Sequence, residues 1–312
     1  MDLKQLRALV TVAEVGSVTR AAEILHLVQP AVTRQIRTLE QEVGMPLFER
    51  TRQGMRPTEA GAHMVYRARR ALHELERARA EIQPTPVSVS GIVTVGLLES
   101  VTDLLAEPLV SAIAAEHPGI ELRLVTAYSG HLQQWLDNED LDLTLLYNMD
   151  NSQSLHTNPL LREGLWAVAP AADELREDRP VPFAEVAEHR LVLPAAGHAL
   201  RALIDRAAGQ AGAELDVAVQ TNSLRVQKRL VQAGHGWTIL PGVGAADDVA
   251  QGLLSAAPLC EPEVRRSVVL ATPRGVRLPL AAQVVARSLM DQVHLAVTDG
   301  RWRSVQPSPF YA

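Results

Sequence analysis

The spacing of hydrophobic residues near the start of the chain predicts three short helices. Gly16 ends the first, and Ser17 or Thr19 can cap the second. Pro30 suits the first turn of the third, where its missing N–H costs nothing, and Gly44 ends that helix. Hydrophobic residues recur along these helices: Leu3, Leu6, Val10 and Ala13 in the first; Ala21, Ala22 and Leu25 in the second; Val32, Ile36 and Leu39 on one face of the third. Three short helices joined by a tight turn are typical of a helix-turn-helix.

The outer face of the third predicted helix carries side chains that can hydrogen-bond to DNA bases. Gln can bond adenine twice, Arg can bond guanine twice, and Thr offers a hydroxyl or a methyl group. A basic hairpin with Gly54 at its turn follows, and such a wing can reach phosphates or the minor groove. An arginine-bearing solvated helix and loop is the alternative, but helix and hairpin together favour DNA. The candidate DNA-binding residues are Gln29, Pro30, Thr33, Arg34, Arg37, Arg50, Arg52 and Arg56.

A long helix is predicted after the hairpin, from Thr58 to about Gln83. No glycine follows Gly61 and no proline precedes Pro84 in this segment, so at 1.5 Å per residue the helix would span roughly 40 Å. Its hydrophobic residues follow alternating steps of three and four: Val65, Ala68, Leu72, Leu75 and Ile82. A helix of this length with so narrow a stripe either packs on its own body or pairs with a second copy. The proline-containing segment 84–90 is the predicted hinge.

From Gly91 onward, short β-branched runs alternate with helical segments. The expected strands cover 92–97, 122–126, 143–147, 165–169, 191–194, 217–221, 237–240 and 268–272. Repeated alternation of strand and helix predicts an open α/β fold, here with two small sheets. In such folds, ligands bind beyond the carboxyl ends of strands and against helix N-termini.

Polar residues follow several of these strand ends and define a candidate ligand pocket. Taken singly, each Ser, Thr or Asn is best explained as a helix cap. Their recurrence at equivalent strand ends favours a shared cleft. Arg201 and His198 could pair with a carboxylate ligand, whereas Glu99 would repel one unless it points to solvent. The candidate ligand-binding residues are Ser100, Val101, Thr102, Ser129, His198, Arg201, Asn222 and Ser223.

Charge is divided unevenly along the chain. The 312 residues carry a formal net charge of −6, which by itself argues against a nucleic-acid partner. Residues 1–90, however, hold 13 Lys and Arg against 10 Asp and Glu, leaving 17 against 26 in the remainder. A basic front joined to an acidic body is expected if only one end meets phosphate. The sequence has no run typical of a signal peptide or membrane span, so we expect a cytoplasmic protein with no membrane partner.

No catalytic or metal-binding motif with usable spacing occurs in the sequence. It contains no G-x-S-x-G, no P-loop and no H-x-x-x-H. The single cysteine, Cys260, excludes an intramolecular disulfide and a cysteine-based zinc site. Its apolar, proline-containing surroundings favour a structural role over a nucleophilic one. We therefore expect a binding protein without metal or cofactor, and not an enzyme.

Short motifs occur in a fixed order along the chain. Those of the N-terminal part are the paired alanines 21–22, Gln29-Pro30-Ala31, Leu39-Glu40, Leu47-Phe48-Glu49-Arg50 and Thr58-x-Ala60-Gly61. Those of the C-terminal part are Gly91-x-Val93-x-Val95-Gly96, Ser129-Gly130, Leu141-Asp142-Leu143 and Gly234-His235-Gly236. Together they resemble the winged helix-turn-helix and the effector-binding domain of LysR-type transcriptional regulators. The 129–132 and 198–201 stretches resemble the nitrogen-assimilation-control branch. Val28 stands where the family usually has serine, which should weaken the start of the third helix by about 1 kcal/mol.

The resemblance implies three parts: a winged helix-turn-helix at 1–58, a linker and dimerisation helix with its hinge at 59–90, and a two-lobed, periplasmic-binding-protein-like α/β domain at 91–312. Lobe I would comprise about 91–162 and 269–297, and lobe II about 163–268. The long helix would pair with a second copy through Val65, Ala68, Leu72 and Leu75. Dimers of the family commonly pair again into tetramers.

The function expected from the resemblance is a LysR-type regulator that binds promoter DNA as a dimer or tetramer and responds to a small-molecule effector bound between the lobes. An effector-independent DNA-binding regulator is one alternative. A small-molecule binding protein without DNA-directed function is another, and residues 1–58 argue against it. RNA polymerase is a further candidate partner. The last dozen residues match nothing in the family and are expected to form a tail.

Overall fold

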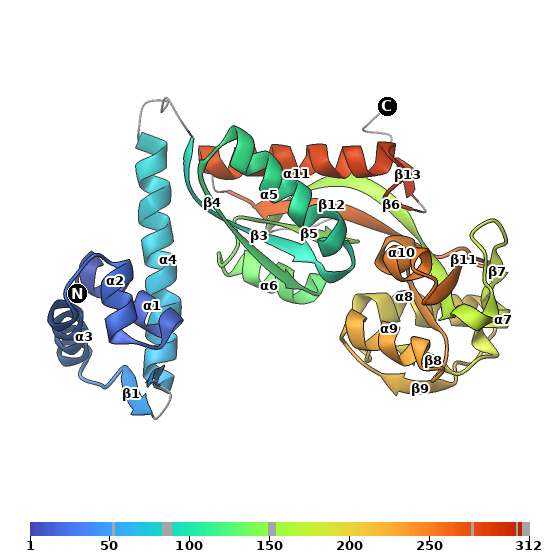
Figure 1. The fold of residues 1–312 in the computed structure, drawn as a ribbon, viewed down its shortest axis with the longest axis horizontal. Coiled ribbons are helices and arrows are strands. Elements are labelled where there is room, and N and C mark those ends of the chain that lie inside the picture. Colours follow the sequence, from blue (N-terminus) through green and yellow to red (C-terminus); the bar gives the residue numbers. More distant parts are fainter. Residues whose placement is uncertain (52–53, 83–88, 149–153, 276–277, 304, 308–312) are drawn as a thin grey trace. The chain divides into compact units, whose positions relative to one another are not determined.

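The computed structural model describes residues 1–51, 54–82, 89–148, 154–275, 278–303 and 305–307. The chain forms two compact units, Met1–Pro86 and Val87–Ala312 (Figure 1). The N-terminal unit has one hydrophobic core and the C-terminal unit has two. Each unit can therefore be understood from its own packing.

The N-terminal unit is a helix-turn-helix followed by a hairpin and a long helix. Asp2 caps the first helix in a capping box with Gln5. Gly16 and Gly44 end α1 and α3 with φ angles of 65° and 76°, which glycine adopts without strain. The elements are α1 (Leu3–Val15), α2 (Val18–Ile24), α3 (Gln29–Val43), β1 (Phe48–Thr51), β2 (Gly54–Pro57) and α4 (Glu59–Ile82). The predicted helices and hairpin are confirmed.

The first residues of α3 lack a side-chain cap, as the sequence predicts. Val28 occupies the cap position with extended backbone and makes no side-chain hydrogen bond to the helix. Its side chain is 70% exposed. Pro30 partly compensates, because its fixed φ is already helical and its position needs no N–H.

The first half of α4 packs against α1 and belongs to the N-terminal core. Val65 and Ala68 are 6% and 2% exposed there. Both residues were expected to meet a second copy, but the helix-turn-helix of the same chain covers them. Leu72 is partly buried beside the same core, and Leu75 is exposed. Within the expected dimer stripe, Leu72 and Leu75 are therefore the candidates that remain for contact with a second copy.

The C-terminal unit is built on a nine-stranded sheet. Seven strands follow the order β4-β3-β5-β12-β6-β11-β7, and the other two, β10 and β13, pair with β6. Its strands are β3 (Ser90–Leu98), β4 (Gly119–Ala127), β5 (Leu143–Tyr147), β6 (Leu155–Pro170), β7 (Val181–Pro182), β10 (Thr238–Pro241), β11 (Leu254–Cys260), β12 (Arg265–Pro273) and β13 (Val305–Pro307). A separate parallel pair is β8 (Leu191–Leu193) with β9 (Val217–Gln220). Strand β3 runs parallel to both β4 and β5, so their carboxyl ends share one edge.

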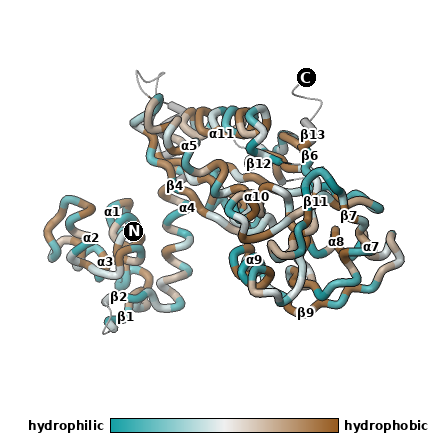
Figure 2. The backbone as a smooth tube through the Cα atoms, turned by 45° about the vertical axis from the view of Figure 1, so that its right-hand side comes forward, coloured by the Kyte–Doolittle hydropathy of each residue, from teal (hydrophilic) through white to brown (hydrophobic). Residues whose placement is uncertain are grey.

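Two hydrophobic cores divide this unit into two lobes. The first lobe packs α5 (Thr102–Glu116), α6 (Ser129–Asp137) and α11 (Leu280–Thr298) on the sheet, and Figure 2 shows hydrophobic and hydrophilic stretches alternating along α11. The second lobe contains α7 (Phe183–Ala187), α8 (Ala199–Ala211), α9 (Leu224–Gln232) and α10 (Gly242–Ala250). Short 3₁₀ turns lie at Glu99–Val101 and Ala171–Asp173.

The sixteen-residue strand β6 passes through both lobes (Figure 1). Its first part pairs with β12 in the first lobe, and its last part pairs with β10 and β11 in the second. Strands of the two sheets expected from the sequence are thus joined through β6, while the expected strands at 191–194 and 217–221 form the separate pair β8-β9. The partner strands β10, β11 and β12 lie roughly 70 to 120 residues further along the chain, a separation that local sequence patterns do not reveal.

The C-terminal segment belongs to the first lobe. Trp302 is 2% exposed in its core, and Val305–Pro307 pairs antiparallel with β6 as β13. The expectation of a tail is therefore wrong for these residues. Burying an indole is strongly favourable when its N–H has an acceptor, and the Trp302 N–H donates to the carboxylate of Glu163 at 2.8 Å.

Candidate functional site

The outward face of α3 presents most of the residues expected to contact DNA. Gln29, Pro30, Arg34 and Arg37 are exposed, and Thr33 is half-buried. The Gln29 amide donates to the Thr33 hydroxyl at 3.3 Å, which links two of these side chains. The opposite face anchors the helix through three buried residues, Val32, Ile36 and Leu39. The polar face consequently does not pack against the core and remains available to a partner.

Hydrogen bonds from backbone N–H groups of the hairpin hold it against the helices. The Glu40 carboxylate accepts N–H groups of Leu47 and Phe48 at 2.8 and 3.2 Å, which ties β1 to α3. The Met55 N–H donates to the Gly16 carbonyl at 2.8 Å, and a Cβ at Gly54 would clash with that carbonyl. The hairpin is therefore fixed in position relative to α3.

Two of the predicted wing arginines can be placed on this hairpin. Arg50 and Arg56 lie on β1 and β2, and both are exposed. Arg52, the third expected wing residue, lies outside the described residues. The described part of the hairpin thus carries two exposed cations, on opposite faces of the two-stranded ladder.

A cavity of about 430 Å³ lies between the two lobes of the C-terminal unit, and we call it the interlobe cavity. The first lobe lines it with residues that follow β3, β4 and β5, whose carboxyl ends share one sheet edge. The second lobe lines it with residues that follow β8 and β9 and with the first turns of α8 and α9. This volume suits a small organic molecule.

Half of the expected ligand-binding residues line this cavity: Ser100, Ser129, His198 and Asn222. The other four do not. Val101 is fully buried in the first core, and the Thr102 hydroxyl donates to the Leu98 carbonyl at 3.0 Å. Ser223 caps α9 by accepting from the Val226 N–H at 3.3 Å. Val101 is thus a core residue, and Thr102 and Ser223 hydrogen-bond to nearby backbone instead of facing a ligand.

Arg201 is also absent from the cavity lining. Its Nε donates to the Asp205 carboxylate at 2.7 Å, one turn along α8, and an Nη donates to the Pro194 carbonyl at 3.4 Å. The expectation that Arg201 faces a ligand is not supported by this geometry. The positive charge that does line the cavity belongs to Arg266, on β12.

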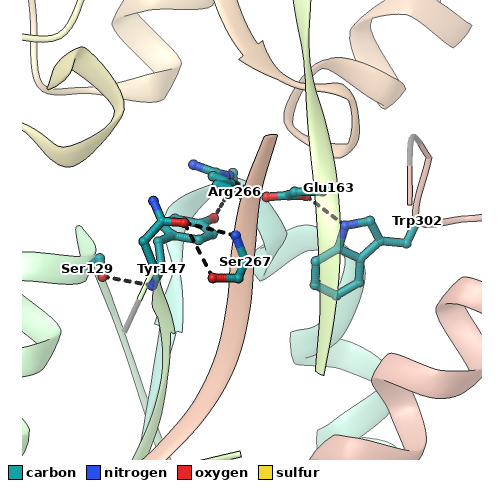
Figure 3. A network of polar contacts seen from close by, with 8 residues as sticks. Ser129, Tyr147, Glu163, Arg266, Ser267 and Trp302 are labelled. Atoms are coloured by element: carbon teal, nitrogen blue, oxygen red, sulfur yellow. Dashed lines mark hydrogen bonds and ion pairs between the residues drawn. The ribbon is translucent and has the colours of Figure 1, made fainter. Parts of the chain in front are cut away.

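Arg266 forms a buried ion pair behind the cavity (Figure 3). Its Nε donates to Glu163 at 2.6 Å, and its Nη2 donates to the Ser100 hydroxyl at 3.3 Å. The guanidinium carbon lies 3.4 Å from the centre of the Tyr147 ring. Glu163 in turn accepts from the Trp302 indole, so the pair is satisfied on both sides, as buried charges require.

Tyr147 and Ser100 complete the polar wall of the first lobe. Their hydroxyl oxygens are 2.6 Å apart, and the Ser129 hydroxyl accepts from the Tyr147 N–H at 3.0 Å (Figure 3). Burial raises the pKa of the Tyr147 hydroxyl well above its ordinary value. It therefore stays a neutral hydrogen-bonding group.

Contacts between the two lobes border the cavity. The Leu224 N–H at the start of α9 donates to the Glu99 carboxylate at 3.4 Å, so an anion from the first lobe meets the positive end of a second-lobe helix. The Tyr128 ring lies 4.6 Å from the His198 ring in an edge-to-face arrangement. Burial, and next the neighbouring Glu99 carboxylate that accepts its hydroxyl, raises the pKa of Tyr128.

His198 presents a hydrogen-bonding group without a protein partner. Its Nδ1 accepts from the Leu200 N–H at 3.1 Å, so the neutral ring carries its proton on Nε2. That Nε2 is buried and has no hydrogen-bond partner among the described residues. Burial, the positive charge of Arg266 and the nearby His131 hold the pKa of His198 below its ordinary value. A neutral donor therefore remains available beside the cavity.

Sequence reasoning missed four polar groups of this site: Tyr128, Tyr147, Glu163 and Arg266. Tyr128 directly precedes Ser129 at a predicted strand end, so the strand-end rule could have found it. Tyr147 ends a predicted strand and could have been found in the same way. Glu163 and Arg266 lie within strands and meet only through the pairing of β6 with β12.

Among the residues that the structure describes, no group of three or more His, Cys, Asp or Glu side chains is placed to hold a metal ion. No described helix has the length and hydrophobicity needed to cross a membrane.

Comparison with known proteins assigns both parts of the chain to one family. Residues 3–62 match the family described as bacterial regulatory helix-turn-helix protein, lysR family, and residues 87–293 match the LysR substrate binding domain. The nitrogen assimilation regulatory protein nac of Escherichia coli (strain K12) is 28% identical over 98% of this chain and 100% of its own. The DNA-binding transcriptional dual regulator OxyR of the same strain is 30% identical over 93% and 95%. Since nac and OxyR are about equally similar, these identities do not single out the nitrogen-assimilation branch.

Solved structures share the fold along the full length. A full-length OxyR from Pseudomonas aeruginosa gives a TM-score of 0.70 at 23% identity, covering 99% of this chain and 98% of that one. Full-length CbnR complexed with its target DNA gives 0.66 at 20% identity, covering 95% and 100%. The chain belongs to the LysR family of DNA-binding transcriptional regulators and carries both their helix-turn-helix and their effector-binding domain.

Proposed function

We propose that α3 enters the major groove of promoter DNA and reads bases with Gln29, Thr33, Arg34 and Arg37. The observation that carries this is the exposed polar face of α3, backed by a fully packed apolar face. Pro30, at the start of the same face, is proposed to press against a thymine methyl group. The docked hairpin supports phosphate or minor-groove contacts by Arg50 and Arg56. Arg52, outside the described residues, is proposed for the same role from its sequence position.

We propose that a second copy of the chain pairs through the later part of α4, where Leu75 is exposed and Leu72 is partly buried. Residues 1–58 would then act as the DNA-binding part, 59–90 as the linker and 91–312 as the effector-binding part. Paired helix-turn-helix units place half-sites about one helical turn apart.

We propose that a small-molecule effector binds in the interlobe cavity and changes how the dimer sits on DNA. Both lobes line the cavity. A ligand that binds one arrangement of the lobes more tightly therefore shifts the population of the protein toward that arrangement. The unpartnered Nε2 of His198 supports a ligand over a vestigial cleft. We infer that the chain acts by this binding and not by catalysis.

Response to peroxide is the competing activity, since OxyR relatives are named as activators of hydrogen-peroxide-inducible genes. A response to peroxide through oxidation of a cysteine needs a reactive thiolate. The chain has one cysteine, Cys260, on β11. Partial burial, with the Glu261 and Glu185 carboxylates, raises its thiol pKa above the ordinary value. These surroundings disfavour the thiolate and support the effector proposal instead.

Capture and sequencing of genomic fragments with the purified full-length protein tests the DNA proposal. We expect a small set of fragments sharing an interrupted palindrome. Arg34→Ala should weaken specific binding by roughly 1 to 3 kcal/mol if Arg34 contacts a base. Arg179→Ala, an exposed arginine in the second lobe, is the matched control and should leave binding unchanged. Absence of enriched fragments at low salt would refute the DNA-binding role.

A further inference from the structure

We propose that the interlobe cavity selects a small organic molecule with a protonated amine on an apolar body, and that it rejects a carboxylate of the same shape. The inference rests on the proposed effector role of this cavity and names its ligand class. It follows from three features of the lining: an open carboxylate, a paired arginine and a neutral histidine donor.

The open carboxylate is Glu99, which lines the cavity on the first-lobe side. It accepts from the Leu224 N–H at 3.4 Å and from the Tyr128 hydroxyl. An ionised carboxylate has about four acceptor positions, so these two neutral donors leave both its charge and some of its capacity available. An ammonium group can use both. An anionic ligand would instead meet a like charge at the start of α9, the position where a helix terminus would otherwise favour it.

Arg266 offsets this charge only in part. Glu163 pairs with its guanidinium at 2.6 Å, Ser100 accepts from Nη2, and Tyr147 covers one face of the plane at 3.4 Å. The arginine side chain is 4% exposed and the carboxylate is fully buried. Glu163 therefore offsets part of the arginine's charge at the cavity, and the remainder acts on His198, whose pKa it lowers. Glu99 is the carboxylate among the lining residues. His131 and His198 are the titratable imidazoles among the lining residues.

An aromatic ring lies beside Glu99, and a neutral donor lies beside that ring. The Tyr128 ring belongs to the same wall, and a carboxylate next to an aromatic ring is a combination that favours ammonium groups. His198 offers its buried Nε2–H to a hydrogen-bond acceptor, and its lowered pKa keeps it from adding a competing positive charge. The ligand expected from these groups carries an amine, an apolar body and one acceptor.

Three probes of matched shape test this selection: phenethylamine, phenethyl alcohol and phenylacetate. Their dissociation constants are measured by calorimetry on the full-length chain at millimolar probe concentration. We expect phenethylamine to bind at least about tenfold more tightly than phenylacetate, with the alcohol between them. Glu99→Gln keeps an oxygen for the Leu224 N–H and removes the charge. It should weaken phenethylamine by about tenfold and strengthen phenylacetate.

Glu214→Gln, an exposed carboxylate of the second lobe, is the control and should preserve the wild-type preference. Thermal unfolding of each variant confirms that it is folded. The proposal is overturned if phenylacetate binds as tightly as phenethylamine, if Glu99→Gln leaves the preference unchanged, or if phenethylamine does not bind. In each case an intact pattern of captured genomic fragments would show that the DNA-binding role stands and that only the ligand class has failed.

Discussion

The outward face of α3 and the wall of the interlobe cavity hold their polar groups in different ways. On α3, the candidate contacts lie within nine consecutive positions, and their guanidinium groups are exposed. At the cavity, Arg266 lines the wall, and Glu163 and Trp302 lie buried behind it; the three come from distant segments and are linked through Glu163. The first face should contribute to DNA affinity and little to folding. The second should contribute to folding as well as to ligand binding.

Two arginines make the same contrast within the C-terminal unit. Arg201 sits at a helix start and pairs along that helix with Asp205, whose side chain is half exposed. Arg266 pairs across two strands with a fully buried carboxylate. The Arg201 side chain is 15% exposed and its partner is 50% exposed, so water still screens this pair in part, whereas removal of one member of the fully buried pair leaves an uncompensated charge. The position in the fold, and not the residue type, decides which arginine matters to the site.

The largest expected effect is on Glu163. Glu163→Ala leaves the Arg266 guanidinium buried without its counter-charge, so the free energy of unfolding should fall by about 3 to 5 kcal/mol. Urea unfolding of the full-length chain measures it. Glu177→Ala is the matched control, because Glu177 also pairs with an arginine, Arg303, but is half exposed. The free energy of unfolding of Glu177→Ala should fall by less than about 1 kcal/mol. Equal losses in the two variants would remove the contrast between buried and exposed pairs.

A smaller effect is expected at Trp302. Trp302→Phe keeps an aromatic ring in the core but removes the N–H that donates to Glu163. An unsatisfied carboxylate oxygen should lower the free energy of unfolding by about 1 to 3 kcal/mol. Urea unfolding again provides the measurement, with Trp135→Phe in α6 as the control. Unchanged stability of Trp302→Phe would mean that the C-terminal segment does not support the buried pair.

A substitution in the hairpin should instead lower DNA affinity and leave stability nearly unchanged. Arg56→Ala removes an exposed side chain, so the free energy of unfolding should change by no more than about 0.5 kcal/mol. Affinity should fall alike for all DNA sequences, and the slope of log K against log salt should decrease by about 1. Gel shifts over a salt series on specific and unrelated fragments measure both. A changed sequence preference would instead show that the hairpin reads bases.

The smallest expected effect concerns pH. The folded chain resists protonation of His198, whose pKa is lowered by burial, by Arg266 and by His131, whereas the unfolded chain takes up the proton near pH 6.5. The free energy of unfolding should therefore fall as the pH drops below about 6.5 toward the folded pKa. His198→Asn still caps α8 but does not titrate, so this part of the pH dependence should disappear. Urea unfolding at about pH 7 and pH 5 compares the two proteins. A variant with unchanged pH dependence would assign the effect to other groups.

Local signals in the sequence predicted much of the fold. Gly16 and Gly44 end their helices as expected, and each strand expected from a β-branched run is present. The strands that the sequence did not predict are β7, β11, β13 and the first part of β6. Of these, β7 and β13 are only two and three residues long, too short to show an alternating pattern.

What the sequence alone determined was the order of the parts, their secondary structure and the strand-end residues Ser100, Ser129, His198 and Asn222. Those features depend on neighbours within a few positions, where turn chemistry and hydrophobic periodicity act. Only the tertiary structure decided that α4 turns Val65 and Ala68 inward, and that β6 and β12 bring Glu163 to Arg266. Such pairings depend on which distant segments pack together, because a buried charge is stable only where the fold supplies its partner.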